Sequence, residues 1–242
     1  SVRKYEPGDP MNRVHWRATA STGTLHSKLY EPSTVAGATF LLDFHRDSHP
    51  AKDEPVRSDL AITATASLVK AIYEMGQQIG LVTNGRDAVD RIRQEGYACD
   101  FRSRDAARRS VAMDDESDRL QPVVVPTRRG PEQFMQIRST LARLELTTGL
   151  TLAELVAETT CRIPRDATII AILPETSDED TIVMSNLVRM GYSVVAIINM
   201  FDDYDYAQAA GKLIAHGVVT RHLKEEASIR TIGRKMLYGA MR

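Results

Sequence analysis

The feature that most constrains the fold of this chain is a regular alternation between short apolar runs and longer amphipathic segments. The short runs are almost wholly apolar and end in turn or polar residues, as strands buried on both faces do. They are residues 39–43, 79–83, 122–125, 168–173 and 193–198. This alternation predicts an α/β fold, Rossmann-like, with a mainly parallel sheet and helices on both faces.

The segments between these runs carry helix start and stop signals. Ser58 is expected to cap the first helix, and Pro131 suits the first turn of the next one. Ser177 precedes three acidic residues, a typical helix start, and Gly191 ends that helix. Further helices are expected over residues 152–160, 203–216 and 225–237.

Composition excludes some classes of protein. The net charge is -1 with 26% charged residues, so there is no overall attraction to nucleic acid or to an anionic membrane surface. No apolar run is long enough to span a bilayer. The sequence contains no phosphate-binding glycine motif, so nucleotide binding has no support. The chain begins at Ser1 rather than at Met, so we expect it to be a segment of a longer protein. The expected location is the cytoplasm, or that of a soluble domain of a membrane-anchored parent.

One stretch breaks the α/β pattern. Residues 97–120 are rich in both charge signs and poor in apolar residues, which predicts a surface insertion. Cys99 and Cys161 lack metal-ligand spacing, and we expect both to be buried thiols in a reducing compartment.

Polar side chains collect where the predicted strands end, and in a parallel sheet these ends meet at one edge. The oxygen atoms there suit a hard divalent cation such as Mg²⁺. The same residue types are also common as helix caps and turn residues, so a structural role stays open. The residues are Asp43, His45, Asp47 and His49 after the first strand, Thr147, Thr148 and Thr151 before a helix, and Glu175 with Thr176 after the fourth strand.

The N-terminal stretch is unlike the rest of the chain. Asp9 followed by Pro10 predicts the start of a short helix, and Arg13 stands one turn after Asp9 and can pair with it. Trp16, the only tryptophan, is then presented to a neighbouring surface. We therefore predict that Asp9, Arg13 and Trp16 take part in an interaction.

The strand-end loops resemble those of the von Willebrand factor A-like fold, which form a metal-ion-dependent adhesion site. The resemblance rests on an apolar strand ending in Asp43, a Gly-x-Thr-Leu helix start containing Thr151, and the acidic loop containing Glu175. It implies a Mg²⁺ site at Asp43, Asp47, Thr151 and Glu175. His45 and Asp47 replace the two serines of the usual first loop, so either the site is degenerate and holds no cofactor or its metal has changed.

The N-terminal stretch is similar to the signature of a bacterial family known as domain of unknown function 58. The resemblance implies a von Willebrand factor A-like domain over residues 37–242, with the family motif in an extension over residues 1–36. It also implies a MoxR-type AAA+ ATPase as protein partner and membrane segments upstream in the parent. The matching positions are Tyr5, Pro7, Gly8, Asp9, Arg13, Val14, Trp16, Ala18, Gly23, Leu25 and Glu31.

Two functions follow from these observations. The first is a non-enzymatic protein-interaction or assembly domain that works with such an ATPase. The alternative is a metal-dependent hydrolase, because two carboxylates and two imidazoles can bind a metal and activate water. Its ligands would be Asp43, His45, Asp47 and His49.

Overall fold

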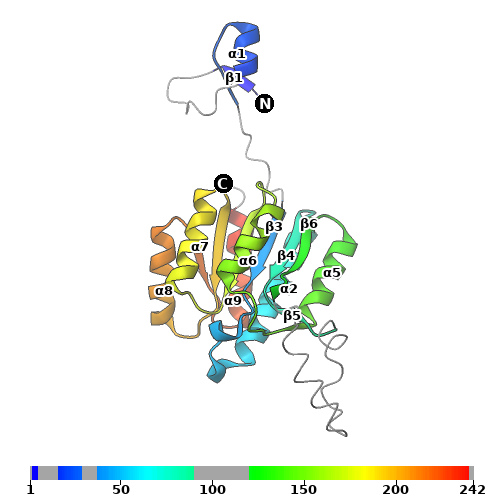
Figure 1. Cartoon of the computed structure of the whole chain (residues 1–242), viewed down its shortest axis with the longest axis vertical. Coiled ribbons are helices and arrows are strands. Elements are labelled where there is room, and N and C mark those ends of the chain that lie inside the picture. The colour runs from blue at the N-terminus through cyan, green and yellow to red at the C-terminus, as the bar shows by residue number, and fades with distance from the viewer. Residues whose placement is uncertain (1, 5–15, 29–36, 90–119, 240–242) are drawn as a thin grey trace. The chain divides into compact units, whose positions relative to one another are not determined.

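The computed structural model describes residues 2–4, 16–28, 37–89 and 120–239 (Figure 1). Its internal contacts divide the chain into two compact units, Ser1–Val35 and Ala36–Arg242. In the first unit, β1 (Val2–Lys4) pairs antiparallel with β2 (His26–Lys28), and α1 (Trp16–Thr22) lies between them in sequence. The predicted insertion over residues 97–120 lies outside the described residues, apart from Leu120.

The second unit is built on a six-stranded sheet in the order β10-β9-β8-β3-β4-β6. Every neighbouring pair is parallel except β4 and β6, which run antiparallel. The predicted mainly parallel sheet is therefore confirmed. Its strands are β3 (Gly37–Leu42), β4 (Gln78–Thr83), β6 (Val123–Arg128), β8 (Thr168–Leu173), β9 (Ser193–Ile198) and β10 (Val219–His222).

Helices cover both faces of this sheet, because strand residues alternate between two apolar clusters. Phe40 and Leu42 of β3 belong to one cluster and Leu41 to the other. The first cluster is covered by α2 (Val56–Glu74), α5 (Pro131–Leu141) and α9 (Glu226–Gly239). The second is covered by α6 (Leu152–Thr159), α7 (Asp178–Arg189) and α8 (Asp203–Ala215).

A small two-stranded ribbon lies beside the main sheet. It pairs β5 (Arg86–Asp87) with β7 (Leu144–Glu145) in antiparallel register. The ribbon connects the loop after β4 with the segment that leads into α6. The ribbon therefore helps to hold the loop after β4 and the loop before α6 at the carboxyl edge of the sheet.

Two expectations from the sequence are wrong. Ser58 does not cap α2: the helix begins at Val56, and the Ser58 hydroxyl donates to the Pro55 carbonyl inside its first turn. Cys161 is a free thiol exposed on a short 3₁₀ helix rather than a buried one. Cys99 lies outside the described residues.

Candidate functional site at the carboxyl edge of the sheet

Asp43 directly follows β3 and is almost completely buried, with 1% of its surface exposed. One of its carboxylate oxygens, Oδ1, accepts from the His45 backbone N–H at 3.0 Å and from the Asn84 side-chain amide at 2.8 Å. Asn84 follows β4, so this contact joins the ends of two neighbouring strands. The other oxygen, Oδ2, is buried and has no hydrogen-bond partner among the described residues.

Asn84 is the central connector of this edge. Its carbonyl oxygen accepts from the Phe44 N–H at 2.6 Å, and its amide also donates to the Leu150 carbonyl at 2.9 Å. It thereby ties the Asp43 loop to the loop before α6. Asn84 was not predicted as a site residue from the sequence, although its place directly after an apolar strand was a usable signal.

Thr147 is the threonine of its loop that packs beside the Asp43 loop. It forms a parallel bridge with His45: the Arg46 N–H donates to the Thr147 carbonyl at 2.8 Å, and the Thr147 N–H donates to the Phe44 carbonyl at 3.2 Å. Its hydroxyl is buried and, like Asp43 Oδ2, lacks a partner in the described structure. Two further buried oxygen atoms of this edge, Thr176 Oγ1 and Asn199 Oδ1, also lack a partner among the described residues.

Thr151, the threonine predicted as a metal ligand, has a different role. It is the N-cap of α6 and is exposed. Its hydroxyl accepts from the Glu154 N–H at 3.3 Å, and the Glu154 carboxylate accepts from the Thr151 N–H at 2.9 Å. This reciprocal pair is a capping box, so the Thr151 hydroxyl already has a structural function.

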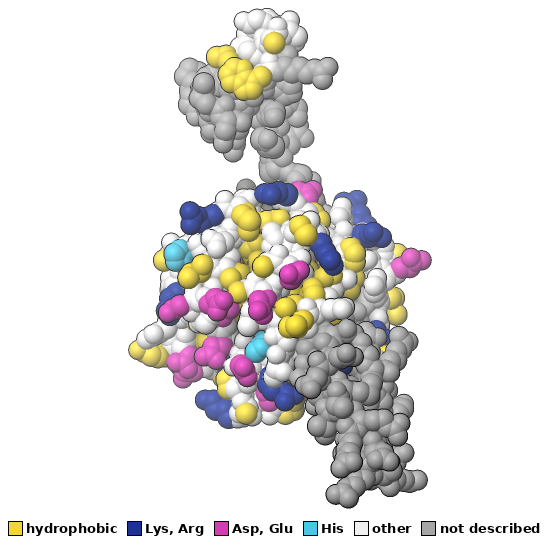
Figure 2. Space-filling view, in the orientation of Figure 1, with side chains coloured by type: hydrophobic (Ala, Val, Ile, Leu, Met, Phe, Trp, Pro, Cys, Tyr) yellow, Lys and Arg dark blue, Asp and Glu magenta, His cyan; other side chains and the backbone are white. Residues whose placement is uncertain are grey.

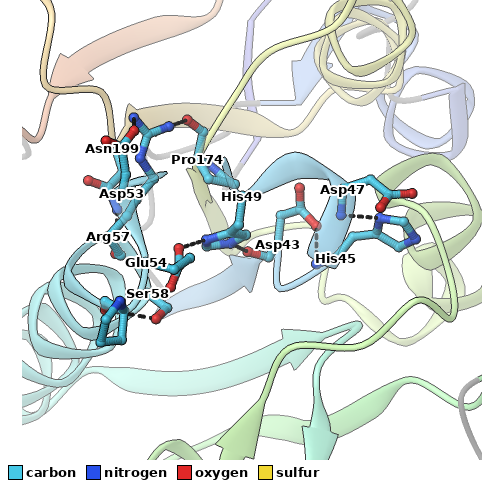
Figure 3. Close-up of polar contacts among 11 residues, drawn as sticks. Asp43, His45, Asp47, His49, Asp53, Glu54, Arg57, Ser58, Pro174 and Asn199 are labelled. Carbon is cyan, nitrogen blue, oxygen red and sulfur yellow. Dashed lines mark hydrogen bonds and ion pairs between the residues drawn. The ribbon is translucent and has the colours of Figure 1, made fainter. Parts of the chain in front are cut away.

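The two histidines of the first loop point in opposite directions (Figure 3). His45 Nδ1 accepts from the Asp47 N–H at 3.3 Å and caps a 3₁₀ helix over Arg46–Ser48. His49 is buried, with Nδ1 2.7 Å from Glu54 Oε1 and Nε2 3.2 Å from the Asp43 carbonyl. Because each ring nitrogen of His49 already faces an oxygen atom, neither is free to bind a metal.

A buried arginine that was not predicted from the sequence connects the loops of the other half of the edge. Arg57 of α2 donates to Asp53 Oδ2 at 2.7 Å and to the Pro174 carbonyl at 3.0 Å, and its guanidinium lies 5.1 Å from the centre of the Phe201 ring. The Asn199 amide donates to the Arg57 carbonyl at 2.8 Å (Figure 3). One side chain thus connects the loops after β3, β8 and β9.

The four predicted metal ligands do not converge in this arrangement. Only Asp43 offers a buried oxygen without a partner, while Thr151 caps α6 and both Asp47 and Glu175 are exposed. The described residues include no group of three or more His, Cys, Asp or Glu side chains placed to hold a metal ion. The Mg²⁺ site at Asp43, Asp47, Thr151 and Glu175 therefore stays a prediction.

Acidic residues at this edge have a simpler explanation. The first turn of α7 contains Asp178, Glu179 and Asp180, and that of α8 contains Asp203 and Asp205. Figure 2 shows acidic side chains gathered at the level of these helix ends. Carboxylates there offset the partial positive charge of the helix N-terminus, so they stabilise the helices.

The predicted interaction residues belong to the N-terminal unit. Asp9 and Arg13 lie outside the described residues. Trp16 is the first residue of α1 and is 65% exposed, and Leu25 is 44% exposed. In Figure 2 the described surface of this unit accordingly carries hydrophobic side chains.

The fold and site define an α/β domain with a mainly parallel sheet, preceded by a separate N-terminal unit. Residues 1–98 match the family described as "Protein of unknown function DUF58", which confirms the family resemblance seen in the sequence. A stretch of 87 residues is 31% identical to the uncharacterized protein YeaD of Bacillus subtilis (strain 168). This stretch covers 36% of the chain but only 20% of YeaD.

Solved structures support the fold alone. A pilus adhesin, SpaC from Lactobacillus rhamnosus GG, aligns with 85% of the chain at a TM-score of 0.54 and 9% identity. Its open conformation aligns with 99% of the chain at a TM-score of 0.53. The chain covers about a third of that adhesin, 31% and 33% in the two structures.

Proposed function

We propose that this chain is a non-enzymatic interaction or assembly domain and that Trp16 contacts a protein partner. The observation that carries the proposal is the 65% exposure of Trp16. Tryptophan is enriched among the residues that dominate binding energy at protein interfaces. A tryptophan left in water on a small unit is therefore best explained by a surface that is covered in a complex.

The carboxyl edge supports a binding role over a catalytic one. The polar side chains at this edge make hydrogen bonds that hold the loops together. Asn84 joins three segments, and Thr151 caps a helix. His49 has an oxygen atom next to each ring nitrogen. The hydrolase with Asp43, His45, Asp47 and His49 as ligands gains no support, because His49 is occupied. The edge is organised as a scaffold.

The partner class comes from the family resemblance. The resemblance implies a MoxR-type AAA+ ATPase as the partner. It also implies that the α/β unit is a von Willebrand factor A-like domain. No helix in the described part of the chain has the length and apolar character needed to cross a membrane. Cytoplasmic location, or attachment to a membrane-anchored parent, stays a prediction.

The test measures binding of the whole chain to the MoxR-type ATPase of the same organism, with and without ATP. Trp16→Ala should weaken binding by about tenfold or more, as loss of a central aromatic contact does. Tyr204→Ala is the matched control, because Tyr204 is 70% exposed but belongs to α8 of the other unit. Equal affinity of Trp16→Ala and the parent chain, or no binding in either nucleotide state, would count against the proposal.

A further inference from the structure

A groove of about 350 Å³ runs along the β10 edge of the sheet, beside α9. Residues from one face of α9 form one wall and residues of β10 form the other, with Tyr206 of α8 at the end. Ile232, 3% exposed, supplies an apolar floor. The polar and charged lining consists of Thr220, Arg221, His222, Lys224, Glu225, Ser228, Thr231 and Lys235.

β10 is an open edge strand, since it pairs with β9 on one side and with no described strand on the other. Backbone groups of successive residues in a parallel strand face opposite sides. The Leu223 N–H donates to the Ile198 carbonyl at 2.9 Å, so position 223 faces β9 and the Thr220 carbonyl, three residues earlier, faces the open side. An incoming strand would find this carbonyl as an acceptor.

Arg221 already occupies that acceptor. Its guanidinium Nη1 donates to the Thr220 carbonyl at 2.8 Å, in the role that an N–H of a neighbouring strand would take. The Nε atom of the same side chain is buried and lacks a partner among the described residues. Arg221 thus blocks the edge and keeps one donor unsatisfied, which is costly unless a ligand acceptor satisfies it.

The charge of the groove selects the ligand. Arg221, Lys224 and Lys235 line it against one carboxylate, Glu225. Lys224 is held 2.7 Å from Asp203, and this contact raises the pKa of Lys224 and lowers the pKa of Asp203. Lys235 is exposed and forms no ion pair within the described structure. Lys235 is therefore open to a carboxylate, and Arg221 becomes available once its hydrogen bond to the Thr220 carbonyl is replaced.

The end wall of the groove is fixed in place. The His222 ring stacks on Tyr206 with 4.0 Å between ring centres, and His222 Nε2 lies 2.8 Å from the Met200 carbonyl. His222 Nδ1 is also 3.6 Å from Asp203 Oδ1. A ligand would meet a rigid wall at this end.

We propose that this groove binds an extended acidic segment of a protein partner, added as a strand beside β10. Strand addition uses backbone hydrogen bonds for affinity and side-chain contacts for selectivity. An N–H of the segment replaces Arg221 at the Thr220 carbonyl, and the released guanidinium pairs with a carboxylate of the segment. The inference rests on this groove and not on Trp16, although both serve an interaction domain.

The probe is an end-blocked heptapeptide VEVEVEV titrated into the ¹⁵N-labelled whole chain, with VKVKVKV as the charge-reversed control. We expect VEVEVEV alone to bind and to shift the backbone amides of Thr220 and His222. A form of VEVEVEV methylated on alternate backbone nitrogens should bind at least about tenfold more weakly, because it cannot pair as a strand. Lys235→Gln should also weaken VEVEVEV binding by about tenfold, the effect of one charge-assisted hydrogen bond.

Arg230→Gln is the matched control for Lys235→Gln, since Arg230 is an exposed cation on the same helix that does not line the groove. It should leave the affinity unchanged. The proposal is overturned by equal binding of the acidic and basic peptides, by full binding of the methylated form, or by no binding of VEVEVEV. Trp16→Ala should bind VEVEVEV normally, so failure of the ATPase interaction and failure of this site are separate results.

Discussion

At the scale of single residues, Asn84 determines how the carboxyl edge is held together. Asp43 Oδ1, the Phe44 N–H and the Leu150 carbonyl all depend on its side chain. These groups belong to loops that are otherwise joined by the backbone bridge between His45 and Thr147 and by the ribbon of β5 and β7. A buried polar group that loses its partner costs more than the net value of the bond itself.

We therefore predict that Asn84→Ala lowers the free energy of unfolding by about 3 kcal/mol, because it leaves the Phe44 N–H and the Leu150 carbonyl without this partner and removes one of the two donors to Asp43 Oδ1. Urea unfolding followed by circular dichroism measures this change. Asn186→Ala is the control: Asn186 is exposed on α7, and its loss should change stability by less than about 0.5 kcal/mol. Similar effects of the two substitutions would show that the Asn84 contacts are not important for the fold.

A residue of the candidate site could be predicted only where its position in the sequence, such as the end of an apolar strand, is enough to place it at the edge of the sheet. Asp43 was found because it ends an apolar strand, and the structure places it at the buried centre of the edge. The resemblance singled out Thr151 rather than Thr147, because the pairing of Thr147 with His45 depends on contacts between distant segments. Arg57 was missed for the same reason: its partners include Pro174, far along the chain.

At the scale of elements, strands inside the sheet were predicted well, the edge strand β6 was predicted in part, and the other edge strand, β10, was not predicted. β8 and β9 have the predicted bounds, because both are apolar runs between turn residues. β10 is missing from the prediction, since a strand with polar residues such as Thr220 and His222 lacks an apolar run. The start of α2 was misplaced because Ser58, a typical cap residue, uses its hydroxyl inside the first turn.

The start of α6 gives a test that separates a helix cap from a metal ligand. If Thr151 acts only through its capping box, Thr151→Ala should lower the free energy of unfolding by about 1 kcal/mol in EDTA and by the same amount in Mg²⁺. Thr151→Asp should keep most of the stability, because aspartate is also a good cap. Urea unfolding in the two buffers measures both variants. A loss that occurs only with Mg²⁺ would instead assign Thr151 to a metal site.

At the scale of the whole molecule, the chain consists of two units with separate sets of contacts, and the family match extends over both. Residues 1–98 include the N-terminal unit together with β3, α2 and β4 of the sheet. The exposed Trp16 and the β10 groove belong to different units. If both proposed surfaces bind, the chain contacts two partners, or two parts of one partner, through different units.

This organisation predicts that the α/β unit is stable without the N-terminal unit. The described members of both apolar clusters all belong to Ala36–Arg242, so we expect removal of residues 1–35 to leave the core buried. The urea midpoint of residues 36–242, followed by circular dichroism, should therefore equal that of the main transition of the whole chain. The shortened chain should also lose binding to the ATPase, because it lacks Trp16, and keep binding to VEVEVEV. A clearly lower urea midpoint would mean that the N-terminal unit stabilises the sheet. Loss of ATPase binding by the shortened chain could then no longer be attributed to the missing contact of Trp16 with the partner.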